Sequence, residues 1–207
     1  MSQHRVVQQL VDRGLKAEDV SRVAREMFSH YESIGLMHQY LPRKGIVVST
    51  GHMKPEIMIV SDRPEEAELQ MGFSGFGMYG FYLMLFLNKL GINVSDVYWT
   101  QVIKKDVPKI DMSIIKDWYK YLHNEIVVTQ PTAIIALGTT SISALAQEPI
   151  KIDKAIGEEF FFEMPDRNIP VIPIRHPRAT LDVDLDELKS YTGETWRNLK
   201  PIEDLLA

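Results

Sequence analysis

Short runs of apolar residues recur along the chain, separated by longer stretches with apolar residues at helical spacing. The runs are rich in Ile, Val and Phe and most are bounded by polar, Gly or Pro residues, which is typical of buried strands. The predicted strands are at residues 46–48, 57–60, 97–103, 133–137, 160–162 and 169–174. The intervening stretches predict helices at residues 81–90, 112–129 and 138–145. This alternation predicts an α/β fold, a three-layer αβα arrangement with a short, mostly parallel central sheet.

The N-terminal part of the chain has a helical pattern of its own. Val6, Val7, Leu10 and Val11 are at helical spacing, and a similar pattern resumes over residues 17–31 after a break near Gly14. We expect this segment, residues 1–40, to be helical and to pack on the rest of the chain. Because there is no internal repeat and no long linker, residues 1–207 are predicted to form a single domain.

The amino-acid composition is typical of a soluble globular protein. The chain has 207 residues, of which 45% are hydrophobic and 25% charged, so it can bury a substantial core. No apolar run approaches the roughly 18 residues of a membrane span, and no signal-peptide pattern is present. The sequence therefore predicts a soluble, cytoplasmic protein without a membrane partner.

The chain contains no cysteine, which excludes disulfides, a thiolate nucleophile, and zinc or iron–sulfur sites built on Cys. Its histidines are scattered without the paired spacing of metal ligands, so we expect no metal site. The formal net charge of −5 argues against indiscriminate binding to polyanions, although it leaves room for a local basic face.

Two of the predicted strands end in segments that carry chemistry. The run at 57–60 is followed by Ser61, Asp62, Arg63 and Pro64, and the run at 169–174 by Arg175, His176, Pro177 and Arg178. Ligands of open α/β sheets bind beyond the carboxyl ends of the strands, so we expect a carboxylate and an imidazole at such a site. A strand-end cap or an ion pair with Arg63 is the structural alternative for Asp62.

Several short motifs occur in a defined order between about residue 45 and residue 181. They are Ser61-Asp62-Arg63-Pro64-Glu65-Glu66-Ala67-Glu68, Ser74-Gly75-Phe76-Gly77, Thr100-Gln101-Val102-Ile103-Lys104, Leu137-Gly138-Thr139-Thr140-Ser141 and His176-Pro177. Together they resemble the uracil-DNA glycosylase superfamily, and within it the family-four branch. There the corresponding motifs are Gly-Glu-Ala-Pro-Gly with a later Glu, Pro-Phe-Val-Gly, Thr-Asn-Val-Val-Lys, Leu-Gly-x-Thr-Ala and His-Pro.

The chain departs from this pattern at several positions. Family-four enzymes hold an iron–sulfur cluster on four cysteines, and this chain has none, so we expect no cofactor. Asp62 stands for the family's Glu, Glu65 for its second Gly, and Gln101 for the Asn that reads the pyrimidine edge. Gly75 stands where the family has the aromatic residue that stacks on the base, and Phe73 and Phe76 flank it.

The resemblance implies an enzyme that flips out uracil or a modified pyrimidine in DNA and hydrolyses its N-glycosidic bond. It implies catalytic roles for Asp62 and His176, near the sugar and the leaving base respectively. The base-binding candidates are Gln101, Phe73, Phe76 and Glu65, and we expect Glu65 to accept a hydrogen bond from a polar 5-substituent. The candidates for contact with DNA phosphates are Arg63, Lys104, Arg175 and Arg178.

The sequence also allows structural explanations for these candidate site residues. Gln101 can instead be a polar residue on the outward face of a strand. Phe73 and Phe76 can be core residues, and the basic residues can be exposed charges on the surface. The altered motif positions also fit a catalytically inactive nucleic-acid-binding or interaction protein that retains the fold. A base-modifying enzyme that uses the same pocket is the third possibility.

Overall fold

The computed structural model describes residues 8, 10–13, 16–23, 25–26, 45–181 and 183–206. Of the predicted N-terminal helical segment, residues 8, 10–12, 17–23 and 25–26 are helical, and Leu10, Val20 and Val23 are buried in a hydrophobic cluster with residues of the domain. Residues 13 and 16 are described but not helical, and the rest of that segment lies outside the described residues. The single-domain organisation over residues 1–207 stays a prediction.

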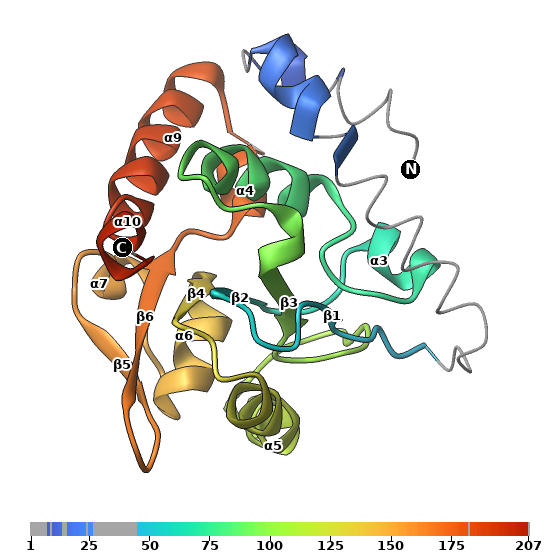
Figure 1. Cartoon of the computed structure of the whole chain (residues 1–207). Coiled ribbons are helices and arrows are strands. Elements are labelled where there is room, and N and C mark those ends of the chain that lie inside the picture. Colours follow the sequence, from blue (N-terminus) through green and yellow to red (C-terminus); the bar gives the residue numbers. More distant parts are fainter. Residues whose placement is uncertain are drawn as a thin grey trace.

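A six-stranded sheet with the order β1-β3-β2-β4-β6-β5 forms the centre of the molecule (Figure 1). The four inner strands run parallel to one another, and β1 and β5 pair antiparallel at the two edges. The strands are β1 (Thr50–Gly51), β2 (Ile57–Ser61), β3 (Val97–Gln101), β4 (Ala133–Leu137), β5 (Phe160–Glu163) and β6 (Asn168–Ile174). The predicted α/β fold with a mostly parallel sheet is confirmed.

The first predicted strand is wrong in its position. Residues 46–48 form no strand; Val48 makes an isolated bridge with Phe73, and β1 begins at Thr50. A short apolar run cannot specify its partner, and here the backbone of Val48 bonds to the loop after α3 (Glu66–Met71).

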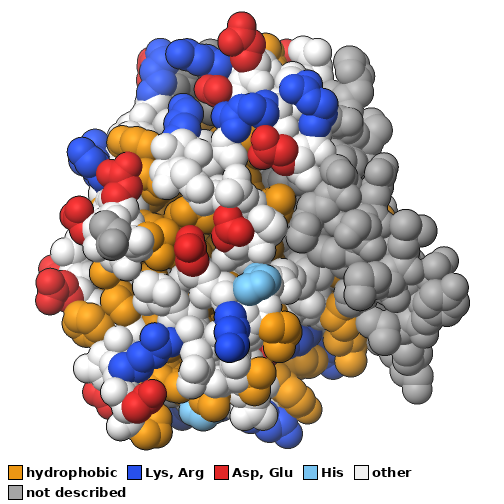
Figure 2. Space-filling model, viewed as in Figure 1, with side chains coloured by type: hydrophobic (Ala, Val, Ile, Leu, Met, Phe, Trp, Pro, Cys, Tyr) orange, Lys and Arg blue, Asp and Glu red, His pale blue; other side chains and the backbone are white. Residues whose placement is uncertain are grey.

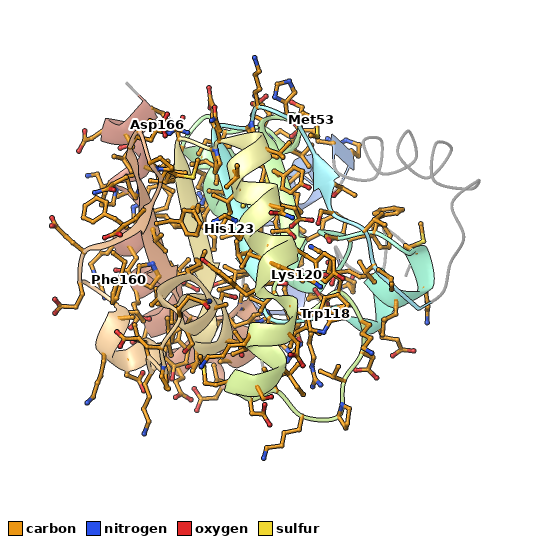
Figure 3. The ribbon with its side chains drawn as sticks, turned by 90° about the horizontal axis from the view of Figure 1, so that it is seen from below. Met53, Trp118, Lys120, His123, Phe160 and Asp166 are labelled. Carbon is orange, nitrogen blue, oxygen red and sulfur yellow. The ribbon has the colours of Figure 1, made fainter. Side chains whose placement is uncertain are left out.

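Helices cover both faces of the sheet. On one face α4 (Met78–Lys89), α9 (Leu185–Leu199) and α10 (Ile202–Leu206) contribute to one hydrophobic cluster. On the other face the second cluster includes residues of α5 (Met112–Thr129), α6 (Gly138–Ala146) and α7 (Ile152–Ala155). Figure 3 shows α5 lying across the sheet, with Trp118, Lys120 and His123 along it. The remaining elements are the 3-10 turn η1 (Val94–Asp96) and α8 (Pro177–Leu181).

The inner strands are apolar throughout because helices cover both faces of the sheet. In β2, Ile57 and Ile59 face the α4 layer while Met58 and Val60 face the α5 layer, and all four are fully buried. A strand buried on both faces loses the alternation of polar and apolar residues, because both directions of the pleat lead into core. Among the described residues, no helix is both long and apolar enough to cross a membrane.

The register of the parallel strands places their carboxyl ends side by side at the same end of the sheet. Ser61 at the end of β2 pairs with Gln101 at the end of β3, and Leu137 of β4 pairs with Ile174 of β6. The pairing of β2 and β3 continues past the strands, since the backbone N–H of Ile103 donates to the carbonyl of Asp62 (3.0 Å). The loops after these four strands therefore share one edge of the sheet.

Candidate active site

The strand-end loops bring Asp62 and His176 together. The Nε2 atom of His176 lies 3.4 Å from Oδ1 of Asp62, and both side chains are largely buried. The backbone N–H of Arg63 donates to the same oxygen (2.7 Å), which fixes the carboxylate at the end of β2. Gly138 allows the imidazole to sit here, because it has a φ of +78° and an added Cβ would lie 3.1 Å from Cβ of His176.

The hydrogen bonds define the tautomer of His176. The backbone N–H of Arg178 donates to Nδ1 (3.1 Å), so in the neutral ring the proton is on Nε2 and points toward Asp62. Burial lowers the pKa of His176 to about 4; Asp62 opposes this shift, and the charge of Arg178 adds to it. The imidazole is therefore neutral at pH 7 and presents an N–H donor.

Two side chains frame the pair. Nη1 of Arg178 lies 3.4 Å from Oδ2 of Asp62, on the side away from the imidazole. The ring of Tyr79 meets the His176 ring edge to face at a centroid distance of 5.1 Å, and the guanidinium of Arg178 lies 5.5 Å from the centroid of Tyr79. Tyr79, in the first turn of α4, thus contacts both ends of the His176–Arg178 segment.

Two further carboxyl groups come from the start of α3. Glu68 is buried, and its oxygens accept hydrogen bonds from the backbone N–H of Gly75 (2.6 Å) and of Glu65 (2.8 Å) and from Nε2 of Gln101 (2.9 Å). Burial and the neighbouring Glu65 raise the pKa of Glu68 to about 8, although its backbone hydrogen bonds act in the opposite direction.

Glu65 is half-buried at the N-cap of α3, and its Oε1 accepts from the backbone N–H of Tyr79 (3.4 Å). A Cβ at Gly77 would overlap this oxygen, so any other residue at the start of α4 would displace the Glu65 carboxyl group. Burial raises the pKa of Glu65 to about 7, while the N–H of Tyr79 and the charge of Arg178 act in the opposite direction.

These groups surround a narrow pocket with about 20 Å³ of space accessible to water. Its walls come from the ends of β2, β3 and β4, the start of α3 and α4, and the loop after β6. The lining residues are Ser61, Arg63, Glu65, Glu68, Gly75, Tyr79, Gly80, Trp99, Thr100, Leu137 and His176. Asp62 lies beside His176 at the edge of this pocket rather than in its wall.

An open groove, with about 450 Å³ of space accessible to water, adjoins the pocket. Glu65, Tyr79 and Arg63 line both, and Arg178 lines the groove. The guanidinium of Arg63 donates to the carbonyl of Val107 and lies 3.9 Å from Asp106, which holds it at the wall of the groove. Elsewhere, on the face shown in Figure 2, acidic and basic side chains drawn in colour are intermixed without a continuous basic stripe.

The predicted base-binding residues differ in whether they reach the pocket. Phe73 and Phe76 are buried and contact each other edge to face (6.0 Å between centroids), so they lie in the core and outside the pocket wall. Gln101 is fully buried and turns its amide toward Glu68, one layer behind the pocket. Of the four candidates, only Glu65 lines the pocket.

Two of the predicted phosphate contacts are engaged inside the protein. The ammonium of Lys104 is buried and bonds to Glu125 (2.8 Å), Thr100 (2.6 Å) and Ser49 (2.9 Å). Arg175 bonds to Asp153 (2.5 Å) and Glu194 (2.9 Å) and lies over the ring of Tyr191. The charges of Lys104 and Arg175 are therefore already paired with carboxylates of the protein.

Tyr79 and Trp99 are site residues that sequence reasoning missed. Tyr79 follows the glycine-rich loop directly, and that position is the only signal that it faces the strand ends. Trp99 lies two residues before Gln101, so the alternation of a strand predicts the same face for both.

Comparisons with known proteins agree with these motifs. The family described as the uracil DNA glycosylase superfamily matches residues 48–200. A Type-4 uracil-DNA glycosylase of Pyrobaculum aerophilum is 33% identical over 114 residues, which is 54% of this chain and 57% of that protein. Similar proteins of the same name occur in Sulfurisphaera tokodaii (29% over 147 residues) and Saccharolobus solfataricus (31% over 147 residues). Each of these matches covers 67% of this chain and 67% and 68% of the relative, respectively.

The cluster expected of family-four enzymes does not fit this chain. Because the sequence contains no cysteine, an iron–sulfur cluster held by four Cys would have no ligands in this chain. Within the described ranges, no three His, Asp or Glu side chains are grouped so that they could hold a metal ion.

Proposed function

Because the chain belongs to the uracil DNA glycosylase superfamily, we propose that it hydrolyses the N-glycosidic bond of uracil or a modified pyrimidine in DNA. The observation that carries the proposal is the contact between Asp62 and His176 beside a pocket at the carboxyl edge of the sheet. The names of the archaeal relatives support it, although the match spans only 57% of the Pyrobaculum protein.

The reaction breaks the bond between C1′ of the sugar and the base nitrogen. The electron pair leaves with the base, a water oxygen bonds to C1′, and the proton that the water gives up neutralises the departed base anion. The transition state therefore has positive charge on the sugar and negative charge on the base, and stabilising both is the task of the site.

His176 acts on the leaving base. Its neutral imidazole carries the Nε2 proton and lines the pocket, so it donates a hydrogen bond to a base oxygen as negative charge develops. A charged imidazole here would cost desolvation energy, and the depressed pKa avoids that cost at pH 7. The edge contact with Tyr79 holds the ring in place.

Asp62 acts on the sugar side. Its carboxylate is fixed by the N–H of Arg63 and lies at the pocket edge, where it offsets the positive charge of the sugar and orients the attacking water. Asp is one methylene shorter than the Glu of the family motif. Arg178, whose Nη1 lies 3.4 Å from Oδ2, is the cationic neighbour of the carboxylate and completes the site.

DNA docks along the open groove. Arg63 and Arg178 line it, and both guanidinium groups are positioned to contact phosphates on either side of an extruded nucleotide. Extrusion costs a few kcal/mol, least for a mispaired or single-stranded base.

Glu65 is the feature that points to a modified base. It lines both pocket and groove at a position where the family motif has glycine. A carboxyl group in this wall disfavours plain apolar contact with C5 of uracil and accepts a hydrogen bond from a 5-hydroxymethyl group.

The test is base release from oligonucleotides with a single uracil or 5-hydroxymethyluracil, single-stranded and duplex. Abasic sites are detected by alkaline cleavage, and D62N serves as the matched inactive control. We expect release of at least one base by the wild type and loss of release in D62N. Binding without release of either base would instead favour an inactive DNA-binding protein. Efficient release of uracil with no action on 5-hydroxymethyluracil would refute the role of Glu65.

A further inference from the structure

The indole N–H of Trp99 is a buried donor without a partner. Trp99 is on β3, lines the pocket, and is only 4% exposed. Its Nε1 atom has no hydrogen-bond acceptor among the described residues. A buried N–H left unsatisfied is destabilising, and such groups are rare in folded proteins, so each one requires an explanation.

A buried acceptor without a partner lies on the same face of the same strand. Gln101, two residues further along β3, donates through Nε2 to Glu68, and its Oε1 has no donor among the described residues. Residues at i and i+2 of a strand point to the same side, so the two side chains lie on the same face of the sheet. The structure thus holds an unpaired donor and an unpaired acceptor on one face of β3, with the donor residue in the pocket wall.

We propose that Trp99 is a specificity-determining residue whose indole N–H donates to a carbonyl oxygen of the base bound in the pocket. The proposal rests on the proposed function, because it assigns the ligand of that same pocket. A uracil-type base presents carbonyl oxygens, which are the acceptors that an indole N–H in the pocket wall can satisfy.

A packing role alone would not explain the unpaired N–H. The Trp99 ring belongs to the hydrophobic cluster with α4, and phenylalanine retains most of that apolar contact. W99F therefore separates the two roles, since it removes the donor while keeping an aromatic ring.

The first measurement is made on the wild type. The chain has three tryptophans, Trp99, Trp118 and Trp196, so a sample with 15N-labelled tryptophan gives few indole N–H resonances to assign. Free uracil is titrated into this sample. We expect the Trp99 resonance to shift and those of Trp118 and Trp196 to stay. Absence of a Trp99 shift, with uracil bound as judged by calorimetry, would overturn the proposal. Assignment uses W99F, or W118F and W196F by elimination if W99F does not fold.

The second measurement compares variants. We expect W99F to lower kcat/KM for base release about 10-fold, the equivalent of one hydrogen bond. W196F, at a half-buried position on α9, is the matched control and should keep the wild-type rate. Some loss of thermal stability in W99F is expected from the smaller buried ring; an unchanged kcat/KM in folded W99F would overturn the proposal.

Different results would refute the glycosylase activity and the base contact of Trp99. Release of base by the wild type with an unchanged Trp99 resonance and an unchanged W99F rate refutes the role of Trp99 alone. A Trp99 shift with uracil, combined with no base release from any oligonucleotide, keeps the base contact and refutes the glycosylase activity.

Discussion

The Nε2 atom of His176 lies 3.4 Å from Oδ1 of Asp62, although the two residues follow strands at opposite ends of the domain sequence. The contact is longer than a strong hydrogen bond, which leaves the N–H available to a ligand. It also makes the imidazole depend on the carboxylate for its orientation. Removing either side chain should therefore affect catalysis far more than folding.

Replacing His176 by alanine should lower the single-turnover rate of base release about 100-fold or more, because the developing anion loses its donor. Binding of oligonucleotide should change little, since the imidazole is buried and neutral. Quench-flow measurement of abasic sites at saturating enzyme checks this. A decrease confined to the KM would contradict a role in the transition state.

The pair Glu65 and Glu68 should make the protein less stable at alkaline pH. Their pKa values, about 7 and about 8, lie above the ordinary value of 4.5, so the folded state holds protons that the unfolded state releases. This contribution is complete below pH 4.5 and is lost as the pH rises through 7 and 8. The free energy of unfolding of E65Q, measured in urea at pH 5 and pH 8, should decrease less than that of the wild type. Equal pH dependence in both proteins would contradict the assignment.

Base release should also decline above pH 7. Deprotonation of Glu65 and Glu68 adds negative charge beside Asp62, at the place where the base becomes anionic. The descending limb of kcat against pH should therefore move to higher pH in E65Q. The position of the limb in Y79F, which retains both carboxyl groups, should be unchanged.

Arg178 and Arg175 should have separable roles despite their closeness in sequence. R178A should weaken binding to single-stranded oligonucleotide and reduce the slope of log K against log salt by about one phosphate contact. R175A should keep the wild-type affinity and slope, but lower the free energy of unfolding by about 2 kcal/mol, because Asp153 and Glu194 lose a charged donor. Fluorescence anisotropy and urea denaturation provide the two readouts.

Lys104 should matter for stability rather than for DNA binding. K104M leaves Glu125 without its ion-pair partner in a largely buried position and should cost about 3–5 kcal/mol. The double variant K104M/E125L should regain part of that loss, as measured by a double-mutant cycle in urea. A salt-dependent loss of DNA affinity in folded K104M would reinstate Lys104 as a phosphate contact.

Sequence pattern was enough to predict five of the six strands and the end of the sheet that carries the site. Runs such as residues 57–60 and 133–137 are apolar throughout because both faces of those strands are covered, so periodicity and length were sufficient. Asp62 and His176 follow parallel strands, and parallel strands end at one edge, so their closeness could be predicted without coordinates.

Only the tertiary structure decided which neighbouring side chains face the pocket. Lys104 follows a strand end just as Asp62 does, yet it turns toward Glu125 and is buried. Trp99 looks like an ordinary strand residue in the sequence, and its unpaired N–H at the pocket becomes visible only when every nearby acceptor has a position. The physical reason is that strand patterns depend on local burial alone. The direction and hydrogen-bond partners of a side chain depend on residues brought in from several elements.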